Sequence, residues 1–190
     1  RRRLVTLSLL SLMLGMHACG GGGGVEEQGT GMTPAFSQGA ISGFGSIIVN
    51  GVHFDESSAV VRDEDGRSLT ADDLKLGMTV AVDSGTIGRV AGTAVATAIT
   101  VGSELLGPVT ANDPLAGTLV VLGQPVQVTA STVFDDRLVG GQAGIALGTP
   151  VEVFAFYDPT SGTYSARRVE PEAGALAFHI RGLVHANNAT

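Results

Sequence analysis

The chain has 190 residues, which is enough for one ordinary domain or two small ones. It carries 11 basic and 18 acidic residues, for a formal net charge of -7, and it has 28 glycines but no Trp. An acidic chain without a basic patch argues against nucleic acid as a partner. Its abundant Val, Thr and Gly favour short strands joined by turns over helices.

Residues 1–18 have the order of a secretory signal peptide. Three arginines are followed by an apolar stretch over residues 4–16, and Ala18 then precedes Cys19. The apolar stretch is shorter than the roughly 20 residues that a transmembrane helix needs. We therefore expect residues 1–18 to direct export and to be removed.

The end of this segment resembles a lipobox, the signal read by the bacterial lipoprotein-processing enzymes. Ala18 and Cys19 match it, Met16 replaces the usual Leu, and His17 stands where a small residue is usual. The resemblance implies cleavage between Ala18 and Cys19, an S-diacylglycerol group on Cys19, and N-acylation (palmitate, for example) of its new amine. More than one acyl chain makes such an anchor stable.

This lipid anchor makes the membrane a partner of the chain. Inner-membrane lipoproteins commonly carry Asp after the lipidated Cys, and Gly20 stands there instead. The resemblance therefore implies an outer-membrane lipoprotein in the cell envelope, facing the periplasm or the cell surface.

A glycine-rich segment follows the cysteine. Residues 20–24 are five consecutive glycines, which cannot hold a helix and lose too much entropy to form a strand. A phosphate-binding loop is rejected, because no strand precedes the glycines and no helix follows them. We expect residues 19–39 to form a flexible, disordered tether.

The remaining residues contain an internal repeat. Segments 40–102 and 103–173 share three blocks in the same order. SIIVNGVHFD matches LVVLGQPVQV, LKLGMTVAVD matches IALGTPVEVF, and GTAVATAITV matches GTYSARRVEP. A third copy begins within residues 174–190, and together with the first residue, which is not Met, this predicts that the chain is a fragment of a longer protein.

Each block reads as a strand, bounded by turn residues. Asn50-Gly51 and Asp65-Gly66 predict two-residue hairpin turns, because both central positions of a type I′ turn need positive φ. Residues 158–162 predict a longer hairpin loop. Thr70 is expected to be the N-cap of a short helical turn that contains Asp72 and Asp73.

Each repeat therefore predicts about five or six strands in a unit too small for a wide sandwich. We expect an all-β fold of tandem small β-barrels, OB-like or SH3-like, because closure removes exposed strand edges. A single larger barrel built from both repeats is the alternative.

The repeated blocks resemble a bacterial family known as domain of unknown function 5666. The pattern is carried by SIIVNGVHFD, LKLGMTVAVD and TAVATAITV in the first copy, and by LVVLGQPVQV, LGTPVEV and YSARRVE in the second. The second copy departs by having Leu122-Gly123 where the first has Asn50-Gly51. The resemblance covers about residues 40–171 and implies β-barrels with no known chemistry.

Few residues suggest a reaction or a metal site. His53 lies on a predicted strand, where a solvated face explains it better than a ligand role. The acidic run Asp63-Glu64-Asp65 allows a calcium site, but it lacks the loop length and final Glu of an EF-hand, and a solvated turn is preferred. His179 and His185 lie in the third copy and do not form a metal-binding pair with known spacing.

The serines and the aromatic residues do not indicate a catalytic or ligand-binding site either. No Gly-x-Ser-x-Gly elbow introduces a serine. Five phenylalanines are spaced as core or rim residues, with an exposed ligand platform as the alternative: Phe44, Phe54, Phe134, Phe154 and Phe156. We therefore expect no catalytic residues, no cofactor and no metal.

The sequence predicts a non-catalytic cell-envelope lipoprotein of unknown molecular activity. Its repeated β-modules would act as binding, interaction or spacer units, with a protein or glycan as partner. Two alternatives are the N-terminal accessory region of a larger envelope hydrolase, and a lipoprotein that binds a small ligand or cation.

Overall fold

A computed structural model describes residues 34–88 and 92–182, and all of them belong to one compact unit. The expected signal peptide, Cys19 and most of the expected tether lie outside these residues. Within the described ranges, regular structure consists of strands and two short 3-10 helices. None of the described helices has the length and apolar character that crossing a membrane requires.

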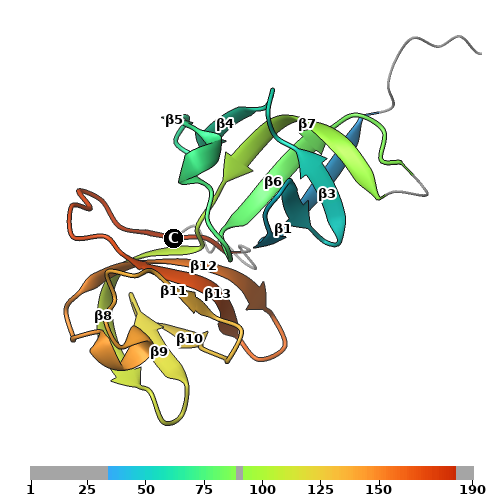
Figure 1. Ribbon diagram of the computed structural model, residues 1–190. Helices are drawn as coiled ribbons and strands as arrows, with labels where there is room; N and C mark the ends of the chain where they lie inside the picture. The colour runs from blue at the N-terminus through green and yellow to red at the C-terminus, as the bar shows by residue number, and fades with distance from the viewer. Residues whose placement is uncertain (1–33, 89–91, 183–190) are drawn as a thin grey trace, which may run out of the picture. The chain divides into compact units, whose positions relative to one another are not determined.

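The first barrel contains seven strands: β1 (Ala35–Gly43), β2 (Ile47–Val49), β3 (Val52–Asp55), β4 (Val60–Asp63), β5 (Ser68–Leu69), β6 (Thr79–Ser84) and β7 (Thr93–Val101). Their order in the sheet is β3-β2-β1-β6-β7-β4-β5. Parallel pairing of β3 with β7 closes the barrel (Figure 1). The 3-10 helix η1 (Ala71–Asp73) connects β5 to β6.

The second barrel repeats this plan with β8 (Leu105–Asp113), β9 (Thr118–Val121), β10 (Gln124–Gln127), β11 (Val133–Phe134), η2 (Gly141–Gly144), β12 (Pro150–Asp158) and β13 (Thr163–Pro171). The order is β10-β9-β8-β12-β13-β11, and β10 closes on β13 in parallel. The strands form two separate sheets, so the alternative of one larger barrel is wrong. The prediction of an all-β fold with tandem small barrels is confirmed.

Each barrel has its own apolar core. Alternating residues point inward, as on β6, where Val80 and Val82 are buried, and on β12, where Val151 and Val153 are buried. Phe154 is an exception: it lies on β12 but packs in the core cluster of the first barrel. Its side chain is 2% exposed and therefore joins the two barrels through apolar contact.

The equivalent hairpins of the two barrels, β2–β3 and β9–β10, have different residues in the same turn conformation. Asn50 (φ 53°) and Gly51 (φ 77°) both have positive φ, which confirms the predicted turn between β2 and β3. Leu122 (φ 50°) takes the same position in the second barrel, although leucine rarely adopts this conformation. The side chain of Leu122 covers Gly107 of the neighbouring strand, where an added Cβ would lie 2.5 Å from Leu122 Cγ.

The predicted helical turn is also present. Thr70 is the N-cap of η1, and the Asp73 side chain accepts hydrogen bonds from both the backbone N–H and the hydroxyl of Thr70. The prediction for Asp65-Gly66 was wrong in detail, because only Gly66 has positive φ. The connection is a longer loop in which Gly66 N–H donates to Asp63 O and Arg67 N–H donates to the Asp63 side chain.

Both ends of the barrel pair differ from the expected boundaries. β1 begins at Ala35, inside the expected tether, because Ala35 to Ala40 pair in register with Ser84 to Thr79 of β6. The expected third copy contributes the short strand β14 (His179–Ile180), which pairs antiparallel with β8 of the second barrel. Its described part therefore extends an existing sheet.

Candidate functional site

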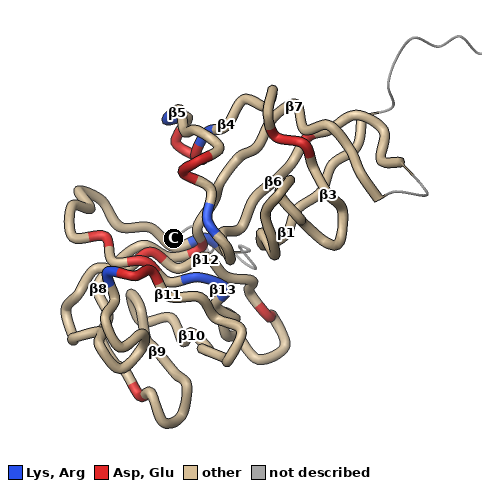
Figure 2. The backbone as a smooth tube through the Cα atoms, viewed as in Figure 1, with Lys and Arg blue, Asp and Glu red and all other residues tan. Residues whose placement is uncertain are grey.

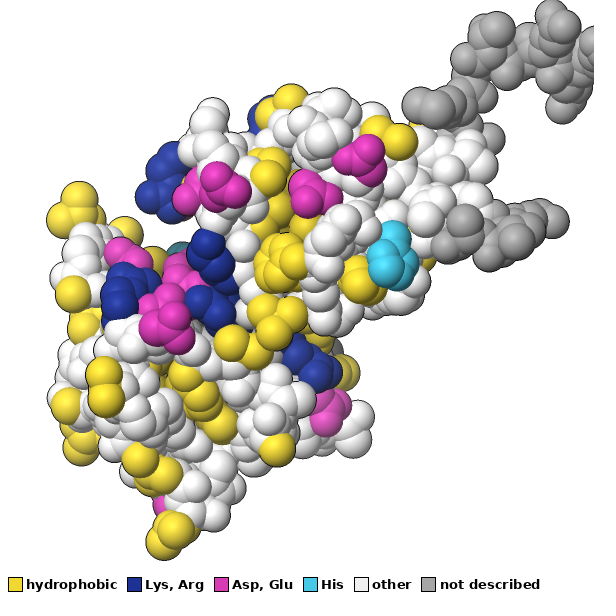
Figure 3. Space-filling model, viewed as in Figure 1, with side chains coloured by type: hydrophobic (Ala, Val, Ile, Leu, Met, Phe, Trp, Pro, Cys, Tyr) yellow, Lys and Arg dark blue, Asp and Glu magenta, His cyan; other side chains and the backbone are white. Residues whose placement is uncertain are grey.

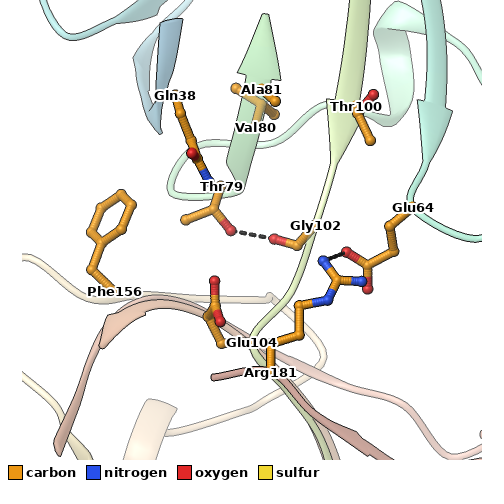
Figure 4. Close-up of a pocket in the computed structure, with 10 residues that line it drawn as sticks. All are labelled: Gln38, Glu64, Thr79, Val80, Ala81, Thr100, Gly102, Glu104, Phe156 and Arg181. Carbon is orange, nitrogen blue, oxygen red and sulfur yellow. Dashed lines mark hydrogen bonds and ion pairs between the residues drawn. The ribbon is translucent and has the colours of Figure 1, made fainter. Parts of the chain in front are cut away.

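The junction of the two barrels contains the most unusual polar environment among the described residues. β7 leads into β8 through Gly102, Ser103 and Glu104, and the segment that begins with β14 passes beside this linker. A small cavity of about 100 Å³ lies here, and Figure 4 shows that Glu64, Glu104 and Arg181 converge on it from both barrels. Charged residues also gather around β4–β5 and β11–β13 in Figure 2.

Glu64 is the centre of the contacts across the junction. It lies in the β4–β5 loop of the first barrel and forms an ion pair with Arg181, which follows β14. His179 Nε2 lies 3.6 Å from Glu64 Oε1. Burial raises the pKa of Glu64 to about 7, although the nearby Arg181 guanidinium lowers it. Glu64 therefore changes its protonation state near neutral pH.

The segment carrying Arg181 is tied to the second barrel through its backbone. The Arg181 N–H donates to Glu104 O at 2.7 Å. The Tyr164 hydroxyl donates to Arg181 O, and Ser103 Oγ lies 3.2 Å from His179 Nε2. This segment therefore connects the two barrels: Arg181 pairs with Glu64 of the first barrel, and β14 extends the sheet of the second.

Ser103, His179 and Glu64 form a serine–histidine–acid cluster, but their geometry does not suit nucleophilic catalysis. In a catalytic triad the acid binds one imidazole nitrogen and the serine binds the other. Here Ser103 and Glu64 both approach Nε2 of His179. Ser103 is only 2% exposed, so a substrate has little access to its hydroxyl. The arrangement supports a structural use of these side chains.

A larger groove of about 720 Å³ adjoins this cavity. Seven carboxylates line it: Asp63, Glu64, Asp65, Asp73, Glu152, Glu170 and Glu172. Arg67 and His179 are the basic residues in the lining, and the apolar ones include Leu69, Met78, Leu106, Phe154, Leu176 and Phe178. The groove therefore combines excess negative charge with apolar surface.

Glu152 has an unfavourable position in this groove. Burial raises the pKa of its carboxyl group, and repulsion from Glu170 and Glu172 raises it further. A hydrogen bond from Ser103 opposes the shift. Burial likewise raises the pKa of Glu104 in the linker.

A second polar cluster connects the barrels through β13. Arg168 is 6% exposed and contacts Glu170 and Asp135, and its Nη2 lies 3.1 Å from Asp135 Oδ2. Its Nη1 donates to Leu76 O of the first barrel at 3.3 Å. Gly77 packs so closely on β13 that an added Cβ would lie 2.6 Å from a backbone oxygen. Figure 3 shows basic and acidic side chains alternating in this region.

The residues considered in the sequence have different surroundings. His53 is exposed, with its Nδ1 3.2 Å from Ser46 Oγ. Asp63 pairs with Arg67 at 2.9 Å and Glu64 pairs with Arg181, so basic side chains contact two carboxylates of the acidic run. The preferred interpretation of this run as a solvated turn is wrong for Glu64, whose side chain is only 14% exposed. No group of three metal-ligating side chains occurs in residues 34–88 and 92–182. Cys19 lies outside the described residues.

The phenylalanines divide between core and surface. Phe54 and Phe154 are buried, Phe134 and Phe156 are half-buried, and Phe44 is 52% exposed. Phe156 lines the small cavity and stacks under the Arg167 guanidinium, 5.4 Å from its ring centroid. These positions fit core and rim roles better than a single aromatic platform.

Three residues of the junction, Glu152, Ser103 and Arg168, were not identified as candidates from the sequence. Glu152 and Arg168 lie on strands, where the alternation of side chains indicates only which face of the sheet each residue occupies. A buried charge on a strand is detectable only when its partner is known, and Arg168 finds partners in β13, in the loop after β11 and in the first barrel. No local signal identifies such a set.

The fold and this junction define the class of the protein: a pair of small closed β-barrels joined through polar and apolar contacts. Their strand orders are equivalent, except that β5 of the first barrel has no counterpart in the second. Residues 107–170, within the second barrel, match the family described as "Domain of unknown function (DUF5666)". No match was found among curated proteins or among solved structures.

Proposed function

We propose that this chain is a non-catalytic lipoprotein of the cell envelope, anchored through acylated Cys19, whose two barrels serve as a binding module held away from the membrane. The observation that carries the proposal is the order of its parts. A positive segment, an apolar stretch, Ala18-Cys19 and five glycines precede a folded barrel pair that begins at β1. An outer-membrane location is part of the proposal.

Contacts within the barrel pair support a binding role. The apolar insertion of Phe154, the Glu64–Arg181 pair and the Arg168–Leu76 hydrogen bond link the barrels at three places. A pair fastened at several points presents a preformed surface, which reduces the entropy lost on binding a partner. Ser103 and Glu64 both approach Nε2 of His179, an arrangement that does not suit a catalytic triad. This supports a binding role over hydrolysis.

Cell fractionation tests the proposed membrane location. The chain is expressed in a bacterium with lipoprotein-processing enzymes, together with Cys19→Ala and with Ser8→Ala in the leader as a matched control. We expect the chain and the Ser8→Ala variant to sediment with membranes and the Cys19→Ala variant to lose this association. Sedimentation of Cys19→Ala equal to that of the unaltered chain would contradict the lipid anchor.

A further inference from the structure

The acidic groove at the junction has properties of a ligand site. Its volume of about 720 Å³ falls within the range of roughly 300–1,000 Å³ that is usual for ligand pockets. It is lined both by apolar side chains, including Met78, Leu106 and Phe154, and by carboxylates. This combination favours a ligand that has apolar and charged parts.

The charges of the groove are only partly neutralised by the protein. Asp63, Glu64 and Glu170 have ion-pair partners in Arg67, Arg181 and Arg168. Within the described part of the chain, the other four carboxylates that line the groove, Asp65, Asp73, Glu152 and Glu172, form no ion pair. The groove therefore has unbalanced negative charge next to apolar surface.

The uncompensated negative charge of the groove is most unfavourable at Glu152. Its carboxylate is largely desolvated on β12, receives a hydrogen bond from Ser103, and is repelled by Glu170 and Glu172. A cationic group placed beside Glu152 would relieve this repulsion and compensate the desolvation. An apolar group next to that cation would contact the side chains of Leu106 and Phe178, which line the same groove, and Phe178 is 51% exposed.

We propose that this groove binds a short basic peptide segment of a partner protein, one that carries lysine or arginine beside an apolar side chain. The positive charge lies against Glu152 and Glu172, and the apolar side chain lies against Leu106 and Phe178. This site identifies the chemistry of the partner of the proposed binding module, and it does not depend on lipidation of Cys19.

Fluorescence anisotropy of the purified full chain tests the site with a labelled peptide, Lys-Leu-Lys-Leu-Lys, against Glu-Leu-Glu-Leu-Glu. We expect only the basic peptide to bind, and we expect added salt to weaken binding, because screening reduces the attraction. Glu152→Gln and Glu172→Gln should each weaken binding about tenfold, which is the size expected from loss of one charged contact. Asp83→Asn, an exposed change on β6 away from the groove, is the control and should bind normally.

Several results would overturn the site. Failure of the basic peptide to bind, or unchanged binding by both glutamine variants, removes the groove as its location. Equally tight binding of spermidine, which has no apolar side chain, overturns the apolar part of the recognition. Because Glu152→Gln removes a repelled carboxylate, this variant should keep or raise the melting temperature, so weaker binding is not explained by unfolding. Loss of membrane sedimentation and loss of peptide binding are separate measurements, so failure of either proposal is distinguishable from failure of the other.

Discussion

The buried position of Glu64 should make the barrel pair less stable as pH rises. The pKa of Glu64 is raised from 4.5 to about 7, with burial as the largest cause. The folded protein therefore holds a proton on Glu64 that the unfolded chain releases between these two values. It follows that the contribution of Glu64 to the free energy of unfolding falls as pH rises from about 4.5 to 7, and is constant above that.

Substitution of Glu64 by Gln isolates this effect. Glutamine resembles the protonated carboxyl group and cannot ionise. A difference of 4.5 against about 7 corresponds to about 3.4 kcal/mol. Because the Glu64 side chain is still 14% exposed, solvent screens part of this effect, and we expect about 1–2 kcal/mol. Glu64→Gln should thus match the unaltered chain at pH 4.5 and exceed its stability by about this amount at pH 8.

Urea unfolding, followed by circular dichroism at several pH values between 4 and 8, provides the measurement. Asp83→Asn serves as the control, because Asp83 is exposed and its substitution should leave the pH dependence unchanged. A Glu64→Gln variant that is less stable than the unaltered chain at pH 8 would refute the reasoning. The ion pair with Arg181 would then outweigh the burial of the carboxylate.

Three further substitutions test the packing. Arg168→Met should cost about 3 kcal/mol in unfolding free energy, because it removes the buried partner of Glu170 and leaves only the more exposed Arg137, 3.6 Å away. Adding Glu170→Leu should recover most of the loss in the same urea assay. Gly107→Ala should cost about 1–3 kcal/mol through its contact with Leu122, and a double-mutant cycle with Leu122→Ala should show coupling; additive losses would disprove the contact. Asn50→Val should lower the melting temperature, since a β-branched residue is strained at φ 53°, whereas Asn50→Gly should have a smaller effect.

Local features of the fold were predictable from sequence because short segments determine them. Asn50-Gly51 specifies its turn through two positive φ angles, and Thr70 with Asp73 specifies the start of a 3-10 helix. Alternation on β6 and β12 likewise identifies the residues that face each core. Repetition of these local signals was enough to predict two small barrels.

The junction was not predictable for a different reason. Glu64 and Arg181 lie far apart in the sequence, and only the docking of one barrel on the other brings them together. Phe154 is similar, because alternation places it on the face opposite Val151 and Val153, and nothing local shows that the other barrel covers that face. Ala35 at the start of β1 was assigned to the tether because its partner, Ser84, lies on a distant strand.

We propose above that acylated Cys19 anchors the barrel pair in the cell envelope. Mass spectrometry of the chain purified from bacterial membranes tests this anchor most directly. We expect an N-terminal peptide that begins at Cys19 and carries the mass of a diacylglyceryl group and an amide-linked acyl chain. A peptide in which Ala18 still precedes an unmodified Cys19, or a mature N-terminus elsewhere, would contradict it.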